Sequence, residues 1–327
     1  MTELVTRVEI PKPSFGIDYQ SSILLMGSCF TEHIGKRMHR LKFNTLYNPF
    51  GVVYNPVSLT NQISMLIHKD SFTADDLHYF NELWFSFSHY TLFSDPDQNI
   101  CLAKINEQFL TGKNFLLSSD VIIFTLGTSY AYKLHESGEV VANCHKMPAD
   151  RFERFFSSSE NSCSHLSDAI RKIRNTNPEV KFIFTVSPIR HWKDGAIDNM
   201  RSKAALIMAI AELQARFTGV YYFPVYEIFM DDMRDYRFYA DDMLHPSSLA
   251  TEMIWERFVQ SFLTPDAINT SREIQSLLKS LDHRPMQTSS TGYKRFIRDL
   301  KYKLHTLENK YSFLNFQEER SHIDKIV

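Results

Sequence analysis

Three short apolar runs outline the predicted core of the chain. They are Ser22–Met26, Val121–Leu126 and Lys181–Val186, and each ends at a small residue or a turn. Continuous apolar runs of this length, rich in β-branched and aromatic residues, are typical of strands that are covered on both faces. Val220–Phe223, which ends at Pro224, is a fourth predicted strand.

Helical patterns alternate with these strands. Apolar residues recur at three- and four-residue steps after the first run, at Phe30, Ile34, Met38 and Leu41. The same spacing recurs in residues 58–68, 105–117, 166–173, 203–217 and 247–263. Strands that alternate with helices predict a mostly parallel sheet with helices on both faces. The alternation is interrupted twice: Leu83–Phe93 predicts one strand of a hairpin, and Tyr130–Ala142 predicts another hairpin.

The pattern changes after Pro265. Ile268–Leu281 and Tyr293–Leu314 are polar, charged stretches with helical spacing. We therefore expect a three-layer α/β domain over residues 1–265, followed by a helical C-terminal tail over residues 266–327. The tail is expected to pack on the core or on a second subunit.

Composition narrows the function classes. Lys and Arg total 36 against 38 for Asp and Glu, a net charge of −2, which argues against nucleic-acid binding. No stretch reaches the 18 or so apolar residues of a membrane span, and the first 16 residues lack the apolar core of a secretory signal. The four cysteines are scattered without metal-ligand spacing, so we expect no metal and a cytoplasmic location. No GxGxxG or P-loop motif indicates a nucleotide cofactor.

The first candidate for chemistry directly follows the first predicted strand, where parallel sheets bind ligands. Gly27 allows a sharp turn, and Ser28 and Cys29 then begin a helix. The free N–H groups and the dipole at a helix N-terminus favour negative charge, so we expect the pKa of the Cys29 thiol to be lowered. The alternative is structural, with Ser28 as an N-cap and Cys29 as a small buried residue.

The second candidate precedes the last helix of the core. Asp242 and His245 are three residues apart, and Pro246–Ser247 follows. A carboxylate can hold an imidazole in the tautomer that a general base requires. The alternative is a solvated surface loop with no chemical role.

The order of these two segments resembles that of the SGNH/GDSL hydrolase superfamily, in which a small nucleophile follows the first strand and Asp-x-x-His completes a triad. Five further segments, between Pro11 and Leu263, make the chain similar to one branch, the GSCFA family. Residues 27–31 resemble the signature of that family, and the others are residues 48–56, 125–128, 141–146, 187–191 and 236–246. In ungapped register, Cys29 takes the nucleophile position, and Ser28 is the alternative nucleophile.

The resemblance also implies an oxyanion hole, which in the superfamily uses a Gly and an Asn in a Gly-x-Asn block. Gly51 fits the first donor. Gly127, Thr128 and Ser129 lack the Asn at the second block, which leaves Thr128, Ser129 or Asn143 as the second donor. The remaining candidates are His145, Arg190 and His191, which we expect to line the pocket and to bind an anionic or sugar group.

The sequence thus predicts ester hydrolysis, with attack by Cys29 or Ser28 on an acyl ester, His245 as base and Asp242 orienting it. The expected substrate is a small-molecule or carbohydrate ester. One alternative is a carbohydrate O-acyltransferase that uses the same triad. Another is a non-catalytic module that binds a sugar or a partner. The oligomeric state is not predicted.

Overall fold

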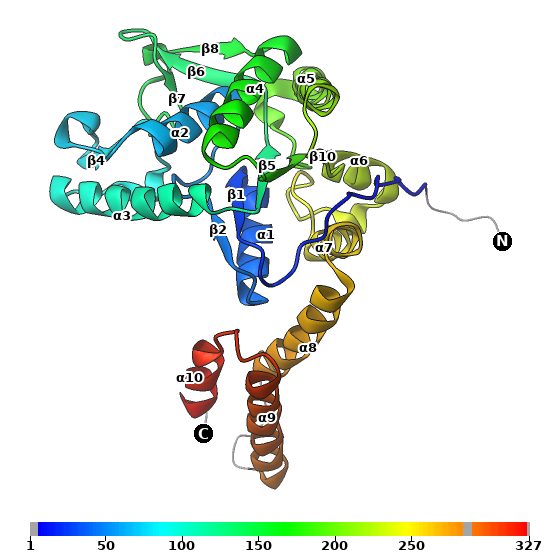
Figure 1. The fold of residues 1–327 in the computed structure, drawn as a ribbon. Helices are drawn as coiled ribbons and strands as arrows, with labels where there is room; N and C mark the ends of the chain where they lie inside the picture. Colours follow the sequence, from blue (N-terminus) through cyan, green and yellow to red (C-terminus); the bar gives the residue numbers. More distant parts are fainter. Residues whose placement is uncertain (1–5, 284–289, 326–327) are drawn as a thin grey trace.

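A five-stranded parallel sheet forms the centre of the protein. The computed structural model describes residues 6–283 and 290–325; the other residues of the predicted domain and tail lie outside this part of the chain. The sheet has the order β10-β9-β5-β1-β2 (Figure 1). Its strands are β1 (Ile23–Gly27), β2 (Thr45–Tyr47), β5 (Val121–Leu126), β9 (Lys181–Val186) and β10 (Val220–Tyr222). The strand order reverses between β1 and β5, and such a switch point is where ligands bind in open parallel sheets.

Helices cover both faces of this sheet. Leu24 and Phe124 point into one apolar cluster together with α2 (Pro56–His68), α3 (Gln98–Leu117), α4 (Ser159–Thr176) and α5 (Gly195–Arg216). Their strand neighbours Leu25 and Ile123 point into a second cluster, because successive side chains of a strand face opposite sides. That second cluster includes residues of α1 (Cys29–Arg40), α6 (Val225–Glu227) and α7 (Ser248–Phe262). The predicted three-layer α/β fold is confirmed.

The smaller strands lie outside the central sheet. β6 (Tyr130–Leu134) pairs with β7 (Val140–Val141), as predicted, and also with β8 (Phe152–Phe156). The hairpin strand predicted at 83–93 is present but shorter: β4 (Leu83–Phe85) pairs antiparallel with β3 (His78–Phe80). The chain turns at once afterwards, where the His89 N–H donates to the Ser86 carbonyl at 3.0 Å.

The tail packs on the core. It consists of α8 (Pro265–Leu281), α9 (Thr291–Lys310) and α10 (Gln317–Lys325), and Figure 1 shows α8 leading away from α7. Apolar residues of all three helices belong to the same cluster as α1. Lys42, just after α1, also pairs with the buried Glu319 of α10 at 2.8 Å. The domain boundary at residue 265 stays a prediction.

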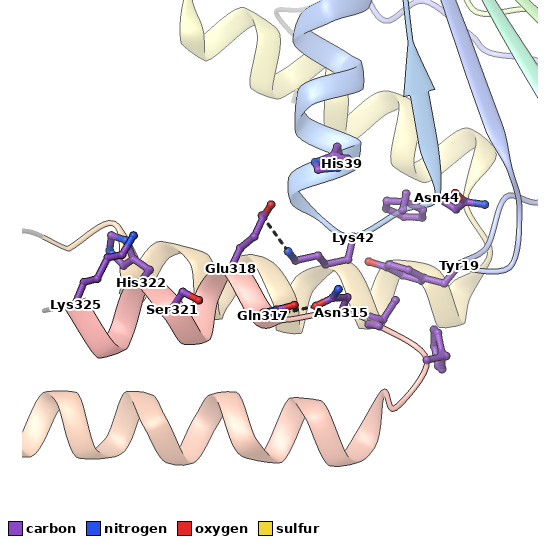
Figure 2. Close-up of a pocket in the computed structure, with 13 residues that line it drawn as sticks. Tyr19, His39, Lys42, Asn44, Asn315, Gln317, Glu318, Ser321, His322 and Lys325 are labelled. Carbon is purple, nitrogen blue, oxygen red and sulfur yellow. Dashed lines mark hydrogen bonds and ion pairs between the residues drawn. The ribbon is translucent and has the colours of Figure 1, made fainter. Parts of the chain in front are cut away.

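A cavity of about 750 Å³ lies between the core and the tail. Figure 2 shows Lys42 extended toward Glu318 of α10, with Tyr19 and Asn44 nearby. Tyr19 and Asn44 precede β1 and β2, so this cavity lies at the end of the sheet where those strands begin. It is therefore separate from the residues that follow β1.

Within the described residues, no helix combines the length and the apolar character that crossing a bilayer requires.

Gly27 provides a test of the geometry at the end of β1. Its φ is +148°, and a Cβ atom added there would lie 2.2 Å from the Thr125 carbonyl oxygen. Gly138 also has a positive φ, +69°, but a Cβ atom there would meet nothing within 4 Å. A positive φ alone costs a non-glycine residue about 1–2 kcal/mol. We expect Gly27→Ala to lower the free energy of unfolding by clearly more than Gly138→Ala, as measured by urea denaturation. Equal losses of stability in the two variants would show that the close approach of Gly27 to Thr125 does not restrict the side chain at this position.

Candidate active site

Ser28 and Cys29 lie in the turn from β1 into α1. The Ser28 N–H donates to the Thr125 carbonyl at 3.1 Å, which fixes this turn against β5. Ser28 is 1% exposed, and its hydroxyl neither caps α1 nor has another partner among the residues that the structure describes. Cys29 is partly exposed. Of the two candidate nucleophiles, Cys29 is therefore the one that a substrate can reach.

The expected lowering of the Cys29 pKa is wrong. Burial raises the pKa of this thiol, and the charge of Glu32 raises it further. The Tyr54 side chain and the N–H groups of Cys29 and Phe30 favour the thiolate, but their effect is smaller than that of burial. Because the thiol does not ionise readily alone, Cys29 requires a base to act as a nucleophile.

Asp242 and His245 form a hydrogen-bonded pair. His245 Nδ1 lies 2.5 Å from Asp242 Oδ2, and both side chains are about half exposed. Asp242 Oδ1 accepts the N–H groups of Leu244 and His245, each at 2.9 Å. These bonds lower the pKa of Asp242 to about 2, so the carboxylate is ionised near neutral pH. In the part of the chain that the structure describes, no hydrogen bond joins His245 to Ser28 or Cys29.

A cavity of about 350 Å³ lies next to Cys29 by way of Tyr54, which lines it and interacts with the thiol; Cys29 itself is not one of the lining residues. Three of the predicted residues line it, Thr128, Asn143 and His191. Tyr54 connects the cavity to the candidate nucleophile, since it lines the wall, interacts with the Cys29 thiol and packs edge-on against His191 with ring centroids 5.5 Å apart. The other lining residues are Asn55, Tyr90, Tyr130, Tyr132, Val141, Ala142, Cys144, Arg154, Lys193 and Asp194.

The predicted oxyanion donors are already bonded within the protein. The Gly51 N–H donates to the Asn48 carbonyl at 2.7 Å. The N–H groups of Gly127 and Thr128 both donate to the Tyr54 carbonyl, at 2.7 and 3.0 Å. The Ser129 N–H and hydroxyl donate to Ser202 of α5. These groups hold the loops in place, and their N–H groups are not free to bind an oxyanion.

Asn48 offers a donor that the sequence did not reveal. Its Oδ1 accepts the Gly27 N–H at 2.8 Å, which leaves Nδ2 on the same planar amide. Nδ2 is buried and has no partner among the described residues. Leaving a buried donor unpaired costs about 1–3 kcal/mol, and unpaired groups of this kind are frequent at functional sites. Asn48 thus places an unused amide donor next to the turn that carries Ser28 and Cys29.

Lys203 of α5 is a second residue that the sequence did not reveal. It is fully buried, and its Nζ donates to the carbonyls of Gly127 and Ser187, both at 2.7 Å. It therefore joins the ends of β5 and β9. Burial lowers the pKa of Lys203 to about 7, and Cys29 is near enough to oppose this shift. The signal in the sequence was one charged residue at helical spacing with the apolar residues Leu206, Ile210 and Leu213.

Two predicted pocket residues do not line the cavity. His145 stacks on Phe85 with ring centroids 4.1 Å apart, and its Nε2 lies 3.0 Å from the Ser86 carbonyl oxygen. Arg190 lies over the Trp192 ring, 5.4 Å from its centroid, and its Nε is buried without a partner in the described chain.

Residues 6–283 and 290–325 contain no group of three or more His, Cys, Asp or Glu side chains that could hold a metal ion.

The neighbouring aromatic cluster generates a pH prediction. His89 is fully buried between Phe50 and Phe72, and burial lowers its pKa to about 3. An unfolded histidine binds its proton near pH 6.5, so between pH 6.5 and 3 the unfolded state holds more protons than the folded state. The free energy of unfolding therefore decreases as the pH is lowered through this range. We expect the free energy of unfolding to drop by about 2 kcal/mol or more from pH 6.5 to 4. His89→Phe is expected to reduce that slope in urea titrations.

The control for this prediction is Phe72→Leu. It weakens packing around His89 but retains the imidazole, so it should lower stability at every pH and leave the slope in place. An unchanged slope in His89→Phe would assign the acid sensitivity to other groups.

Comparisons with known proteins place the chain in a family. The GSCFA family model matches residues 22–258, and a model described as the GSCFA domain protein, C-terminal domain, matches residues 274–327. A search of curated proteins finds no match. One similar solved structure is an acetyl xylan esterase from the rumen bacterium Butyrivibrio proteoclasticus, at 12% identity and a TM-score of 0.36. That alignment covers 74% of this chain and only 63% of the esterase, and similarity this low does not indicate a shared activity. The match over residues 22–258 shows that the chain belongs to the GSCFA family.

Proposed function

We propose that the protein is an SGNH-like hydrolase that cleaves an acyl ester through Cys29. The observation that carries this proposal is the position of that thiol. Cys29 is partly exposed at the N-terminus of α1, at the switch point between β1 and β5, and its thiol interacts with Tyr54, which lines the cavity. The proposed substrate is a small-molecule or carbohydrate ester, and the proposed location is the cytoplasm.

In the proposed first step, Cys29 Sγ attacks the carbonyl carbon while His245 Nε2 takes the thiol proton. Asp242 holds the imidazole through Nδ1 and stabilises the imidazolium that forms. The oxyanion accepts hydrogen bonds from the Cys29 N–H in the first turn of α1 and from Asn48 Nδ2. The ester C–O bond then breaks, and the leaving alkoxide takes the proton from His245. Water, activated by His245, hydrolyses the remaining thioester.

This mechanism requires the loop that carries His245 to close on Cys29. The loop is exposed, and Met243 within it adopts a left-handed backbone conformation, with φ at +61°. We therefore place this closure at substrate binding, when the site loses water and each charge interaction strengthens.

A non-catalytic binding module is the competing function. It is favoured by the raised pKa of Cys29 and by the lack of a hydrogen bond from His245 to it in the described chain. A carbohydrate O-acyltransferase is also compatible with the same thioester, with a sugar hydroxyl instead of water as the acceptor. Turnover with and without an added sugar acceptor separates these functions.

The first test concerns the nucleophile. We expect Cys29→Ala to abolish hydrolysis of 4-nitrophenyl acetate, because the enzyme then has no group to acylate. Ser28→Ala should retain turnover, because the Ser28 hydroxyl is buried. Mass spectrometry of the acid-quenched wild type should locate the acetyl group on Cys29. Turnover by Cys29→Ala together with an inactive Ser28→Ala protein would transfer the role to Ser28.

The second test concerns Asn48. Asn48→Asp keeps the acceptor for the Gly27 N–H but replaces the Nδ2 donor with an oxygen. Losing one oxyanion donor lowers kcat by about 10²–10³-fold, and we expect that loss with little change in KM. Asn161→Asp, on the exposed surface of α4, is the matched control. A normal kcat in an Asn48→Asp protein that melts like the wild type would remove Asn48 from the mechanism.

A further inference from the structure

The charges around the cavity beside Cys29 are unbalanced. The pKa of His191 on its wall is lowered to about 4, first by burial and then by Lys203, Lys193, Arg154 and His245. Each of these four neighbours is a cation or becomes one on protonation. The lining also holds one carboxylate, Asp194, so the groups around His191 carry a net positive charge.

One of the lining cations is neutralised. Arg154 donates to Asp194 at 2.6 Å, and the carboxylate of Asp194 is almost fully buried against it. The guanidinium also lies 3.6 Å from the centroid of the Tyr130 ring, a cation–π arrangement that holds it in place. Arg154 thus forms part of the cavity wall, and the carboxylate of Asp194 neutralises its charge.

Lys193 is different. It lines the same cavity and contacts Tyr132, through a weak hydrogen bond to the hydroxyl at 3.4 Å and with its Nζ 5.7 Å from the centroid of the ring. It forms no ion pair with a carboxylate in the described chain. Its charge nevertheless acts on Cys144 and His191, which both line the cavity. Lys193 is therefore an uncompensated cation at this cavity.

Two further basic side chains lie outside the cavity. Lys203, behind the ends of β5 and β9, has no carboxylate partner in the part of the chain that the structure describes, and burial lowers its pKa to about 7, so it is partly charged near neutral pH. Arg190, next to His191, has no carboxylate partner in the described residues. Lys193 is exposed, so salt screens its charge more than the charge of a buried group; at low salt the net positive charge at the cavity attracts an anion.

We propose that the cavity beside Cys29 binds an anionic group on the ester substrate, a carboxylate or a phosphate, with Lys193 as the contact. This inference rests on the proposed esterase function and specifies its substrate class. A volume of about 350 Å³ suits a ring-sized group with its charge toward Lys193. The tyrosines on the wall supply flat apolar surface for the remainder of that group.

The test compares esters of the same shape and different charge. They are 4-acetoxybenzoate, its neutral amide 4-acetoxybenzamide, and 4-acetoxyphenyl phosphate. We expect kcat/KM at low salt to be at least about tenfold higher for an anionic ester than for the amide, and the ratio to fall as salt is added. The carboxylate and the phosphate arms identify which anion is preferred.

Substitutions then assign the effect to one side chain. Lys193→Met should bring the anionic-to-neutral ratio close to one, and Lys193→Glu should invert it. Lys172→Met is the matched control, because Lys172 lies on α4 and pairs with Asp168 at 2.9 Å. A wild-type ratio near one, or a ratio that survives Lys193→Glu, would overturn the proposal.

A binding measurement separates this inference from the proposed function. Calorimetry with the Cys29→Ala protein compares 4-hydroxybenzoate and phenyl phosphate with 4-hydroxybenzamide, and needs no turnover. Tighter binding of the anions without hydrolysis of any ester would overturn the esterase and support the anion site. Hydrolysis of all three esters at equal rates, with equal binding, would support the esterase and overturn the anion site.

Discussion

The close approach of Gly27 to the backbone of Thr125 is the constraint on which the candidate site depends. No side chain fits between these two strand ends, so β1 and β5 meet directly at the switch point of the sheet. The next residue is then bonded to β5 through its N–H, and the Asn48 side chain bonds to Gly27 itself. One missing Cβ atom therefore sets the positions of Cys29, of the Asn48 amide and of the loop after β5.

Much of the fold follows from the sequence, for a physical reason. A strand buried on both faces must be apolar throughout, and β1, β5 and β9 have that pattern. The edge strand β2 has three partly buried residues and was missed, because a short edge strand carries no distinctive pattern. The hairpin strand predicted at 83–93 was too long, because alternating aromatic residues also occur where side chains pack around a turn.

The candidate site was predictable in part. Cys29 and the pair of Asp242 and His245 follow from motif order, whereas the donors at Gly51 and Gly127 depended on where backbone N–H groups point. No sequence pattern reports that orientation. The pKa of Cys29 illustrates the same limit, since a helix N-terminus and burial act in opposite directions and only the depth of the thiol decides which is larger. Lys203 was missed because burial of a lysine depends on carbonyl groups contributed by two distant strands.

The tail has a consequence for how the chain reaches its folded state. Ile323 of α10 belongs to the same apolar cluster as Ile23 of β1, so the two ends of the described chain complete one side of the core together. Contacts between residues so far apart in sequence close slowly, because the loop entropy must be lost before the contact forms. During synthesis, the helices of the opposite face can assemble first, while the α1 side stays incomplete and exposes apolar surface until α10 has emerged.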